Sequence, residues 1–340
     1  MITLKELAAK CGVSIATVSN ILNGKGNVSE DTRKRILEII RETGYRPNYM
    51  ARGLRAAKTK TIGVIADDFT AFSSPMLIEG IMDYCQEHDY KIIFENLRLY
   101  YRCKDSVDDP KEIVKYVYEA VEEMLTIKVD GIIYVAAHSR AIDYIPKDLK
   151  IPLVLAYSTS QDNSISFVQI DDIASSHEIT EYLLNKNLSK MAIVAGKEQS
   201  LHTIDRIMGL KKAFEEKNLT FDEDLLVYGK WDRQSGYESC KKLFAKNKKI
   251  DVIYCFNDLM AVGVYDYCKE NNIEIGKDIF VAGFDNREIS PFLHPSLTTM
   301  EIPLLDIGRK SAMILVNKIN GTKDVNELRL PCRLIKRQSV

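Results

Sequence analysis

The stretch TLKELAAKCGVSIATVSNILN, residues 3–23, contains two short amphipathic segments separated by a glycine. Thr3 and Glu6 have the spacing of a capping box, which starts a helix at the next residue after Thr3. Gly12 tolerates the positive φ that a sharp turn requires, and Ser14 can cap a second helix. Two short helices joined by a tight glycine turn indicate a helix-turn-helix unit.

A third helix is predicted to complete this unit. Ser29 can cap its start and Gly44 can end it. Four apolar side chains of this helix are expected to pack inward: Ile36, Leu37, Ile39 and Ile40. A three-helix bundle without a ligand is the alternative interpretation of residues 1–46.

The second helix exposes side chains of the kind that read a DNA groove. Asn20 can make a bidentate bond to adenine, while Ile15 and Ala16 can touch a thymine methyl group. Thr17 and Ser19 can bind phosphates, which position the protein without reading sequence. The residues predicted to contact DNA in the head and the segment after it are Thr3, Ser14, Ile15, Ala16, Thr17, Ser19, Asn20, Asn23, Tyr45, Asn48 and Ala51.

The charge distribution supports a DNA-binding head. Residues 1–60 contain twelve Lys and Arg and five Asp and Glu, a net charge of +7, whereas the remainder contains 35 and 43, a net charge of −8. A basic head on an acidic body is typical of a nucleic-acid-binding module joined to a second domain. A solvated run of charges is the alternative.

Residues 47–60 are predicted to form a hinge helix and linker. Pro47 disfavours helix at Arg46, and Asn48 can cap a helix that runs to about Ala56. A helix this short is unstable alone and here it is flanked by basic side chains, so we expect it to fold on contact with DNA. A plain linker is the alternative.

Four segments together resemble one family. They are residues 3–23, VSEDTRKRILEIIRETGYRPNYMARGL (28–54), CFNDLMAVGV (255–264) and VAGFDN (281–286). The chain resembles the lactose-repressor (LacI/GalR) family of bacterial transcription regulators over essentially its whole length. The resemblance implies a homodimer on a pseudo-palindromic operator, with both hinge helices in the minor groove and Leu54 as a wedge between base pairs.

From Lys60 onward, short apolar runs alternate with amphipathic stretches, which predicts doubly wound parallel sheets. The strand runs are TIGVIA, KIIFEN, GIIYV, PLVLAY, MAIVAG, DVIYCF and IFVAGFD, and RLPCRLIKRQSV at the C-terminus is interpreted as a final strand and tail. The resemblance specifies a periplasmic-binding-protein-like α/β domain over 61–340, with two subdomains joined by three crossings near Ser166, Ser296 and Lys323. The N-subdomain is then about 61–165 and 297–322, and the C-subdomain about 166–296 and 323–340.

Ligands of such folds bind at the carboxyl ends of the strands, where this chain carries polar and aromatic residues suited to a sugar. By resemblance, Arg206 is a clamp for a hydroxyl or carboxylate, Asp285 accepts from a hydroxyl beside Asn257, and Trp231 stacks on the sugar ring. The residues predicted to bind the effector are Phe69, Phe72, Ser73, Ser74, Tyr157, Arg206, Trp231, Asn257 and Asp285.

Each assignment has an alternative. Trp231 can be a core residue, Asp285 a helix cap, and Arg206 part of a surface ion pair. Tyr157 departs from the family, which often has an acidic or basic ligand there. The segment 96–112 is longer than usual and either covers the cleft mouth or lies on the surface.

Several classes of protein are not indicated. No apolar stretch is long enough to span a bilayer and the N-terminus lacks a signal peptide, so a cytosolic location is expected. The seven scattered cysteines are interpreted as buried thiols. Because no P-loop, G-x-S-x-G or zinc-protease motif occurs, we expect no enzyme activity, cofactor or metal.

These observations predict a repressor of carbohydrate-use genes. It binds operator DNA in a sequence-specific manner, and a small ligand in the cleft, a sugar, changes its operator affinity. Two alternatives stay open: the same architecture with a purine or other non-sugar effector, and a periplasmic-type solute-binding protein.

Overall fold

The structure is a computed structural model, and it describes residues 2–22, 28–45, 58–103, 110–322 and 325–340. The segment predicted as the hinge lies mostly outside the described residues. Four residues predicted to contact DNA also lie outside them: Asn23, Asn48, Ala51 and Leu54.

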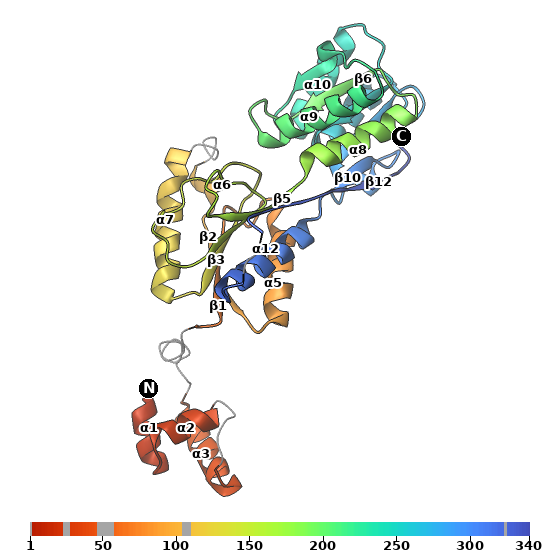
Figure 1. Cartoon of the computed structure of the whole chain (residues 1–340). Coiled ribbons are helices and arrows are strands. Elements are labelled where there is room, and N and C mark those ends of the chain that lie inside the picture. Colours follow the sequence, from red (N-terminus) through yellow and green to blue (C-terminus); the bar gives the residue numbers. More distant parts are fainter. Residues whose placement is uncertain (1, 23–27, 46–57, 104–109, 323–324) are drawn as a thin grey trace.

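Three helices form the head (Figure 1): α1 (Leu4–Cys11), α2 (Ile15–Leu22) and α3 (Glu30–Thr43). They enclose a small core of six buried side chains: Leu7, Ala8, Cys11, Val18, Ile21 and Ile36. Ile39 and Ile40 pack against this core as predicted. The inward placement of Leu37 is wrong, because its side chain is 46% exposed on the outer face of α3.

The first lobe of the body, the N-lobe, contains a parallel sheet in the order β11-β5-β4-β3-β1-β2. Its strands are β1 (Thr61–Ala66), β2 (Lys91–Asn96), β3 (Gly131–Val135), β4 (Leu153–Ala156), β5 (Ser166–Ile170) and β11 (Glu327–Leu330). Its helices are α5 (Ser74–Glu87), α6 (Leu99–Arg102), α7 (Pro110–Ile127) and α12 (Leu304–Ile319). Ile62 and Val64 join the core under α5 and α12, whereas Ile65 joins the core under α7, as the alternation of side chains along a strand requires.

The second lobe, the C-lobe, has a sheet in the order β12-β10-β9-β8-β6-β7, in which only β12 is antiparallel to its neighbour. Its strands are β6 (Met191–Ala195), β7 (Leu226–Tyr228), β8 (Val252–Cys255), β9 (Phe280–Asp285), β10 (Thr298–Glu301) and β12 (Arg333–Ile335). Its helices are α8 (Asp172–Asn185), α9 (Leu201–Glu216), α10 (Arg233–Ala245) and α11 (Asp258–Glu270), with short 3-10 turns at Glu223–Leu225 and Ser290–Phe292.

The three predicted crossings between the lobes are displaced along the chain. β5 pairs with β4 and β11 pairs with β5, so both lie in the N-lobe, whereas β10 pairs with β9 in the C-lobe. The chain therefore crosses after Ile170, Glu301 and Leu330 rather than near Ser166, Ser296 and Lys323 (Figure 1). These strands, SFVQI, TTME and ELRL, mix polar with apolar residues, so they lack the apolar run that marks the other strands.

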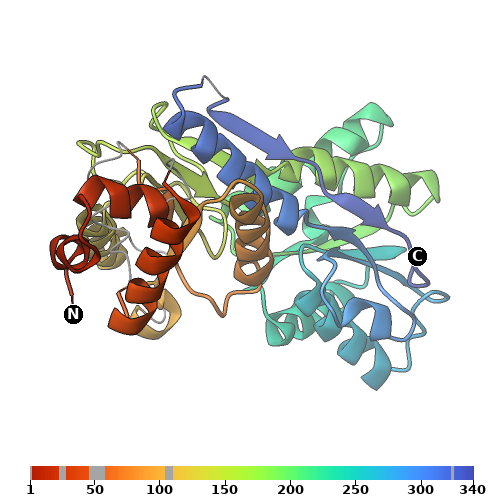
Figure 2. The ribbon, with the colours of Figure 1, turned by 90° about the horizontal axis from the view of Figure 1, so that it is seen from below.

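The predicted C-terminal strand is in fact two strands, β11 and β12, one in each lobe. In the N-lobe, α5 and α12 lie side by side (Figure 2). A Cβ atom at Gly80 would lie 2.0 Å from the Leu305 carbonyl oxygen, so this helix pair packs closely only because glycine stands at the crossing. The crossing helix α12 is thereby joined to the N-lobe core.

All seven cysteines are buried and free, as predicted. Within the described residues, no helix is long and apolar enough to cross a membrane.

Candidate functional site

The turn between α1 and α2 is held by bonds between neighbouring residues. The Thr3 N–H donates to Glu6 Oε2 at 2.7 Å, and the Glu6 N–H donates to Thr3 Oγ1 at 3.3 Å, which is the predicted capping box. Gly12 has a φ of +65°. The Thr17 N–H donates to Ser14 Oγ at 3.1 Å. These bonds set the direction in which α2 leaves the turn.

The helix α2 buries Val18 and Ile21 and presents its other face to solvent. Ile15, Ala16 and Asn20 are exposed on that face. The remaining described candidates for DNA contact are exposed or half-buried: Thr3, Ser14, Thr17, Ser19 and Tyr45. The face that would enter a groove is therefore separate from the face that packs the head.

A cleft of about 720 Å³ lies between the two lobes. Residues of both lobes line it, and they include seven of the nine predicted effector-binding residues. These seven are Phe72, Ser73, Tyr157, Arg206, Trp231, Asn257 and Asp285.

The other two, Phe69 and Ser74, are not among the lining residues. The Phe69 ring packs edge-on against Phe94 at 6.1 Å between centroids. The Ser74 hydroxyl is buried and donates to the Asp68 carbonyl oxygen at 2.7 Å. Both side chains serve the packing and the start of α5, so the structure does not place them at the cleft.

Arg206 is buried in the wall of the cleft, with 2% of its surface exposed. Its Nε donates to Asp172 Oδ1 at 2.7 Å, and a second guanidinium nitrogen donates to the Phe256 carbonyl oxygen. The guanidinium carbon lies 3.5 Å from the centroid of the Phe284 ring. The alternative that Arg206 forms a surface ion pair is therefore wrong, because its partner Asp172 is buried with it.

His202 connects this pair to the other lobe. Its Nδ1 is 2.6 Å from Asp172 Oδ2, and the Ser139 N–H of the N-lobe donates to its Nε2 at 3.2 Å. Burial acts to raise the pKa of Asp172, but the nearby His202 and Arg206 outweigh it and hold that pKa below its ordinary value.

Asp285 has an internal partner that the sequence did not indicate. Its Oδ2 accepts from Arg287 Nε at 3.0 Å. The Arg287 guanidinium also lies 4.0 Å from the centroid of the Phe72 ring, in the opposite lobe. Burial raises the pKa of Asp285, against the opposing charges of Arg287 and Arg206. Among the described residues, the Asp285 carboxylate accepts from the Arg287 side chain and not from a backbone N–H at a helix start, as a helix cap would.

Behind Asp285, the buried Asp258 carboxylate holds the loop that follows β9. It accepts from the Ser290 hydroxyl at 2.6 Å, the Thr299 hydroxyl at 2.7 Å and the Arg287 N–H at 2.8 Å. Burial, and then the charge of Asp285, raise the pKa of Asp258 to about 7.

Trp231 is half-buried and forms part of the cleft wall. The Asn257 side-chain amide donates to the Trp231 carbonyl oxygen at 2.9 Å, and its oxygen accepts from the Met260 N–H at 2.8 Å. A Cβ atom at Gly196 would lie 1.9 Å from the indole. The amide of Asn257 is therefore engaged in positioning the indole and capping α11.

Three lining residues adopt positive φ angles: +65° at Tyr157, +70° at Trp231 and +117° at Asp285. This conformation is uncommon for residues other than glycine, and such residues cluster at functional sites. Their grouping around one cleft supports its role in binding.

Sequence reasoning missed several residues that line the cleft, among them His202, Arg287 and Lys230. His202 precedes Arg206 by one helical turn, which is a signal that the sequence did contain. Tyr100 also lines the cleft, so the described part of the long segment 96–112 reaches it. Residues 104–109 of that segment lie outside the described residues.

Arg140 is a further lining residue that the sequence did not indicate. Both terminal nitrogens of the Arg140 guanidinium donate to the carboxylate of Asp67, which follows β1, at 2.6 and 2.8 Å. Burial acts to raise the pKa of Asp67, but Arg140 holds it below the ordinary value. In the described part of the chain, no His, Cys, Asp and Glu side chains are grouped so that they could hold a metal ion.

Comparisons with known proteins agree with this architecture. Residues 3–48 match the family described as bacterial regulatory proteins, lacI family, and residues 180–340 match a periplasmic binding protein-like domain. The HTH-type transcriptional regulator RegA of Clostridium saccharobutylicum is 33% identical over 341 residues, which cover 99% of this chain and 98% of that protein. Catabolite control protein A of Priestia megaterium is 32% identical over 342 residues, 99% of each chain.

The crystal structure of the Lac repressor dimer bound to operator and the anti-inducer ONPF has the same fold. Its TM-score is 0.81 at 21% identity, and the match covers 99% of this chain and 98% of that chain. The predicted fold class, a helix-turn-helix head with a two-lobed α/β body, is confirmed. The relatives span head and body together, which a periplasmic-type solute-binding protein does not explain. The chain belongs to the LacI family of bacterial transcriptional regulators.

Proposed function

We propose that this regulator represses carbohydrate-use genes and that a sugar bound in the cleft changes its affinity for operator DNA. The observation that carries the proposal is that the cleft walls come from both lobes and touch across it. Ser139 bonds to His202, and Phe72 packs on Arg287. A ligand between these walls competes with both contacts, so its binding free energy acts on the arrangement of the lobes.

The chemistry of the cleft suits a sugar. The rings of Trp231 and Phe72 offer apolar faces, while Arg206 and Asp285 offer a donor and an acceptor for hydroxyl groups. A few polar groups placed among apolar walls are what fixes a small ligand in a pocket. The similarity to catabolite control protein A supports a role in carbohydrate use.

In this proposal the head reads the operator through the exposed face of α2. A homodimer would place two heads on a pseudo-palindromic site, with Asn20, Ile15 and Ala16 at base edges and the nearby hydroxyls at phosphates. Leu54 keeps its proposed role as a minor-groove wedge. A coupling free energy of about 1–3 kcal/mol between cleft and head changes operator affinity by roughly 5–150-fold.

The test begins with selection of the preferred DNA site from a random duplex library by the full-length protein. Thermal shift with mono- and disaccharides, and with purine bases as the competing class, then identifies the ligand. Fluorescence anisotropy measures operator affinity with and without it. We expect a sugar to change that affinity in wild-type protein, and Asp285→Ala to lose this response while it keeps its affinity for DNA.

Asp266→Ala, which removes an exposed ion pair with Arg233, is the matched control and should behave as wild type. Weak binding to all DNA sequences, whatever ligand is added, would contradict the proposal. If purines alone changed the operator affinity, the effector would be a purine and not a sugar.

A further inference from the structure

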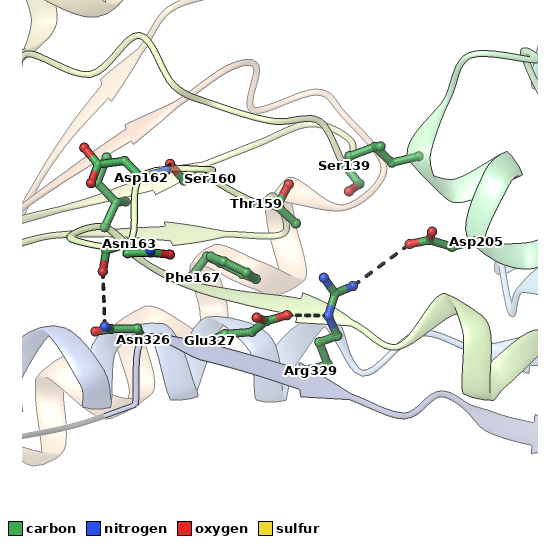
Figure 3. A pocket seen from close by; sticks show the side chains of 12 residues that line it. Ser139, Thr159, Ser160, Asp162, Asn163, Phe167, Asp205, Asn326, Glu327 and Arg329 are labelled. Atoms are coloured by element: carbon green, nitrogen blue, oxygen red, sulfur yellow. Dashed lines mark hydrogen bonds and ion pairs between the residues drawn. The ribbon is translucent and has the colours of Figure 1, made fainter.

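A second, smaller cavity of about 380 Å³ lies beside the cleft, where the chain crosses between the two lobes. We call it the hinge pocket after these crossings, and the name does not refer to the predicted hinge helix. Figure 3 shows a wall of Thr159, Ser160, Asp162 and Asn163 with Phe167 on β5, an edge of Glu327 and Arg329 on β11, and Asp205 on α9 of the C-lobe. Ser139 and Leu201 line both cavities, so they form the partition between them. The hinge pocket therefore spans both lobes where β5 and β11 approach the C-lobe.

The two cavities differ in charge. Five Lys and Arg side chains and one carboxylate line the cleft, and two of these cations, Arg140 and Arg206, are paired with the buried carboxylates of Asp67 and Asp172. Three carboxylates and one basic residue line the hinge pocket: Asp162, Asp205, Glu327 and Arg329. Acidic surroundings disfavour a phosphorylated or carboxylated ligand, because like charges repel at short range.

The uncharged part of the lining is suited to hydroxyl groups. The lining includes the hydroxyls of Thr159 and Ser160, the amides of Asn163 and Asn326, and the Phe167 ring. The Ser160 hydroxyl donates to Asp143 Oδ1 at 2.8 Å and the Asn326 amide donates to the Asn163 carbonyl oxygen at 3.1 Å, which leaves Thr159 and the Asn163 amide for a ligand. Carboxylates and amides accept hydrogen bonds from hydroxyls, amides also donate them, and an aromatic ring offers an apolar face. The volume lies within the range of small-ligand pockets.

One polar contact across the pocket is incomplete. Arg329 Nε donates to Glu327 Oε1 at 2.6 Å, whereas Arg329 Nη1 lies 4.0 Å from Asp205 Oδ2. That distance is too long for a hydrogen bond, and the two groups belong to different lobes. A ligand hydroxyl can bond to both, which would join β11 to α9 at the turn that carries His202 and Arg206.

We propose that the hinge pocket binds an uncharged polyhydroxyl ligand of monosaccharide size, independently of the ligand in the cleft. Such a ligand bridges Arg329 and Asp205 and holds the lobes together at this edge. The pocket is thus a second site at which small molecules act on the regulator.

The test uses thiol labelling of the full-length Asn163→Cys variant. Asn163 is exposed at the pocket, and all seven native cysteines are buried, so the new thiol should react fastest. The test ligands are D-glucose, D-galactose and myo-inositol, with glucose 6-phosphate and spermidine as charged comparisons. At ten times its Kd, a bound ligand should slow labelling by about tenfold, because only unoccupied protein reacts.

Thr126→Cys, on the exposed surface of α7, is the matched control and should react at the same rate with and without ligand. Protection of Cys at 163 should persist when Asp285→Ala is added in the cleft and should be lost with Arg329→Met. Four results would overturn the proposal: no protection by any uncharged ligand, equal protection at position 126, loss of protection with Asp285→Ala, or stronger protection by either charged compound.

Discussion

The face of the head proposed to contact DNA and the cleft of the body are held in place by different kinds of contact. In the head, Thr3 bonds to Glu6 and Ser14 to Thr17, each three residues along the chain. In the cleft, Asp172 bonds to Arg206 and Ser139 to His202, 34 and 63 residues apart. Substitutions on the head surface should therefore change recognition alone, whereas those in the cleft should change both ligand binding and stability.

Asp172→Ala is expected to have the largest effect. It leaves the buried guanidinium of Arg206 without its carboxylate, and an uncompensated buried charge costs about 3–5 kcal/mol of the free energy of unfolding. Urea unfolding followed by circular dichroism measures the loss. Arg233→Ala, which breaks the exposed pair with Asp266, should change stability little. Equal losses of the free energy of unfolding in both variants would show that the buried pair in the cleft stabilises the protein no more than the exposed pair does.

Gly196→Ala tests the wall of the cleft without touching the head. The added Cβ would lie 1.9 Å from the Trp231 indole, so the ring has to move, at a cost of about 1–3 kcal/mol typical of overpacking. The chain has one tryptophan, and its emission maximum should shift while ligand affinity falls. An unchanged emission spectrum would contradict this placement of the ring. Trp231→Phe should lack this emission, which confirms that the signal comes from Trp231.

Asn20→Ala tests the head. Asn20 is exposed, so the melting temperature should stay unchanged, while the preference at one operator position falls by about 1–3 kcal/mol. Binding-site selection followed by affinity measurement on single-base variants checks this. Asn185→Ala, on an exposed helix end of the C-lobe, should keep the wild-type preference. If Asn20→Ala kept it as well, α2 would read the site through other residues.

The pH dependence of C-lobe stability tests the environment of the buried Asp258 carboxylate. Burial raises the pKa of Asp258 from 3.8 to about 7, so the native state binds this proton more tightly than the unfolded chain. Stability from this group is present below the ordinary pKa and is lost as pH rises toward 7. Melting temperatures at pH 5 and pH 8 should therefore differ less in Asp258→Asn than in wild type. An identical difference in both proteins would count against the raised pKa.

Asp172 and Asp67 should destabilise the protein when the pH falls, whereas Asp258 should destabilise it when the pH rises. Their pKa values are held below the ordinary value by the adjacent cations. Their contribution is therefore present at neutral pH and is lost as pH falls through the lowered pKa values.

Much of the fold could be predicted because buried parallel strands are nearly continuous apolar runs. TIGVIA and GIIYV became β1 and β3 at the predicted residues. The strands β5 and β10 were missed because polar residues interrupt them, β7 because it has three residues, and β11 was merged with β12. The predicted crossings were misplaced because β5, β10 and β11 adjoin them. For the candidate site, the rule on strand ends led to Tyr157 and Asp285, which do line the cleft. The rule could not indicate Arg287, which follows the strand end and reaches the other lobe.

The head and the alternation of strands and helices in the body could be predicted from the residues alone. Caps, glycine turns and apolar periodicity act between residues a few positions apart, so they can be read directly from the chain. The folded chain was needed to learn which charges pair in the cleft, which strands belong to each lobe, and that a second pocket with an acidic lining adjoins the first. Those features depend on contacts between residues far apart in the chain. Such residues meet only when the two sheets and their helices have packed.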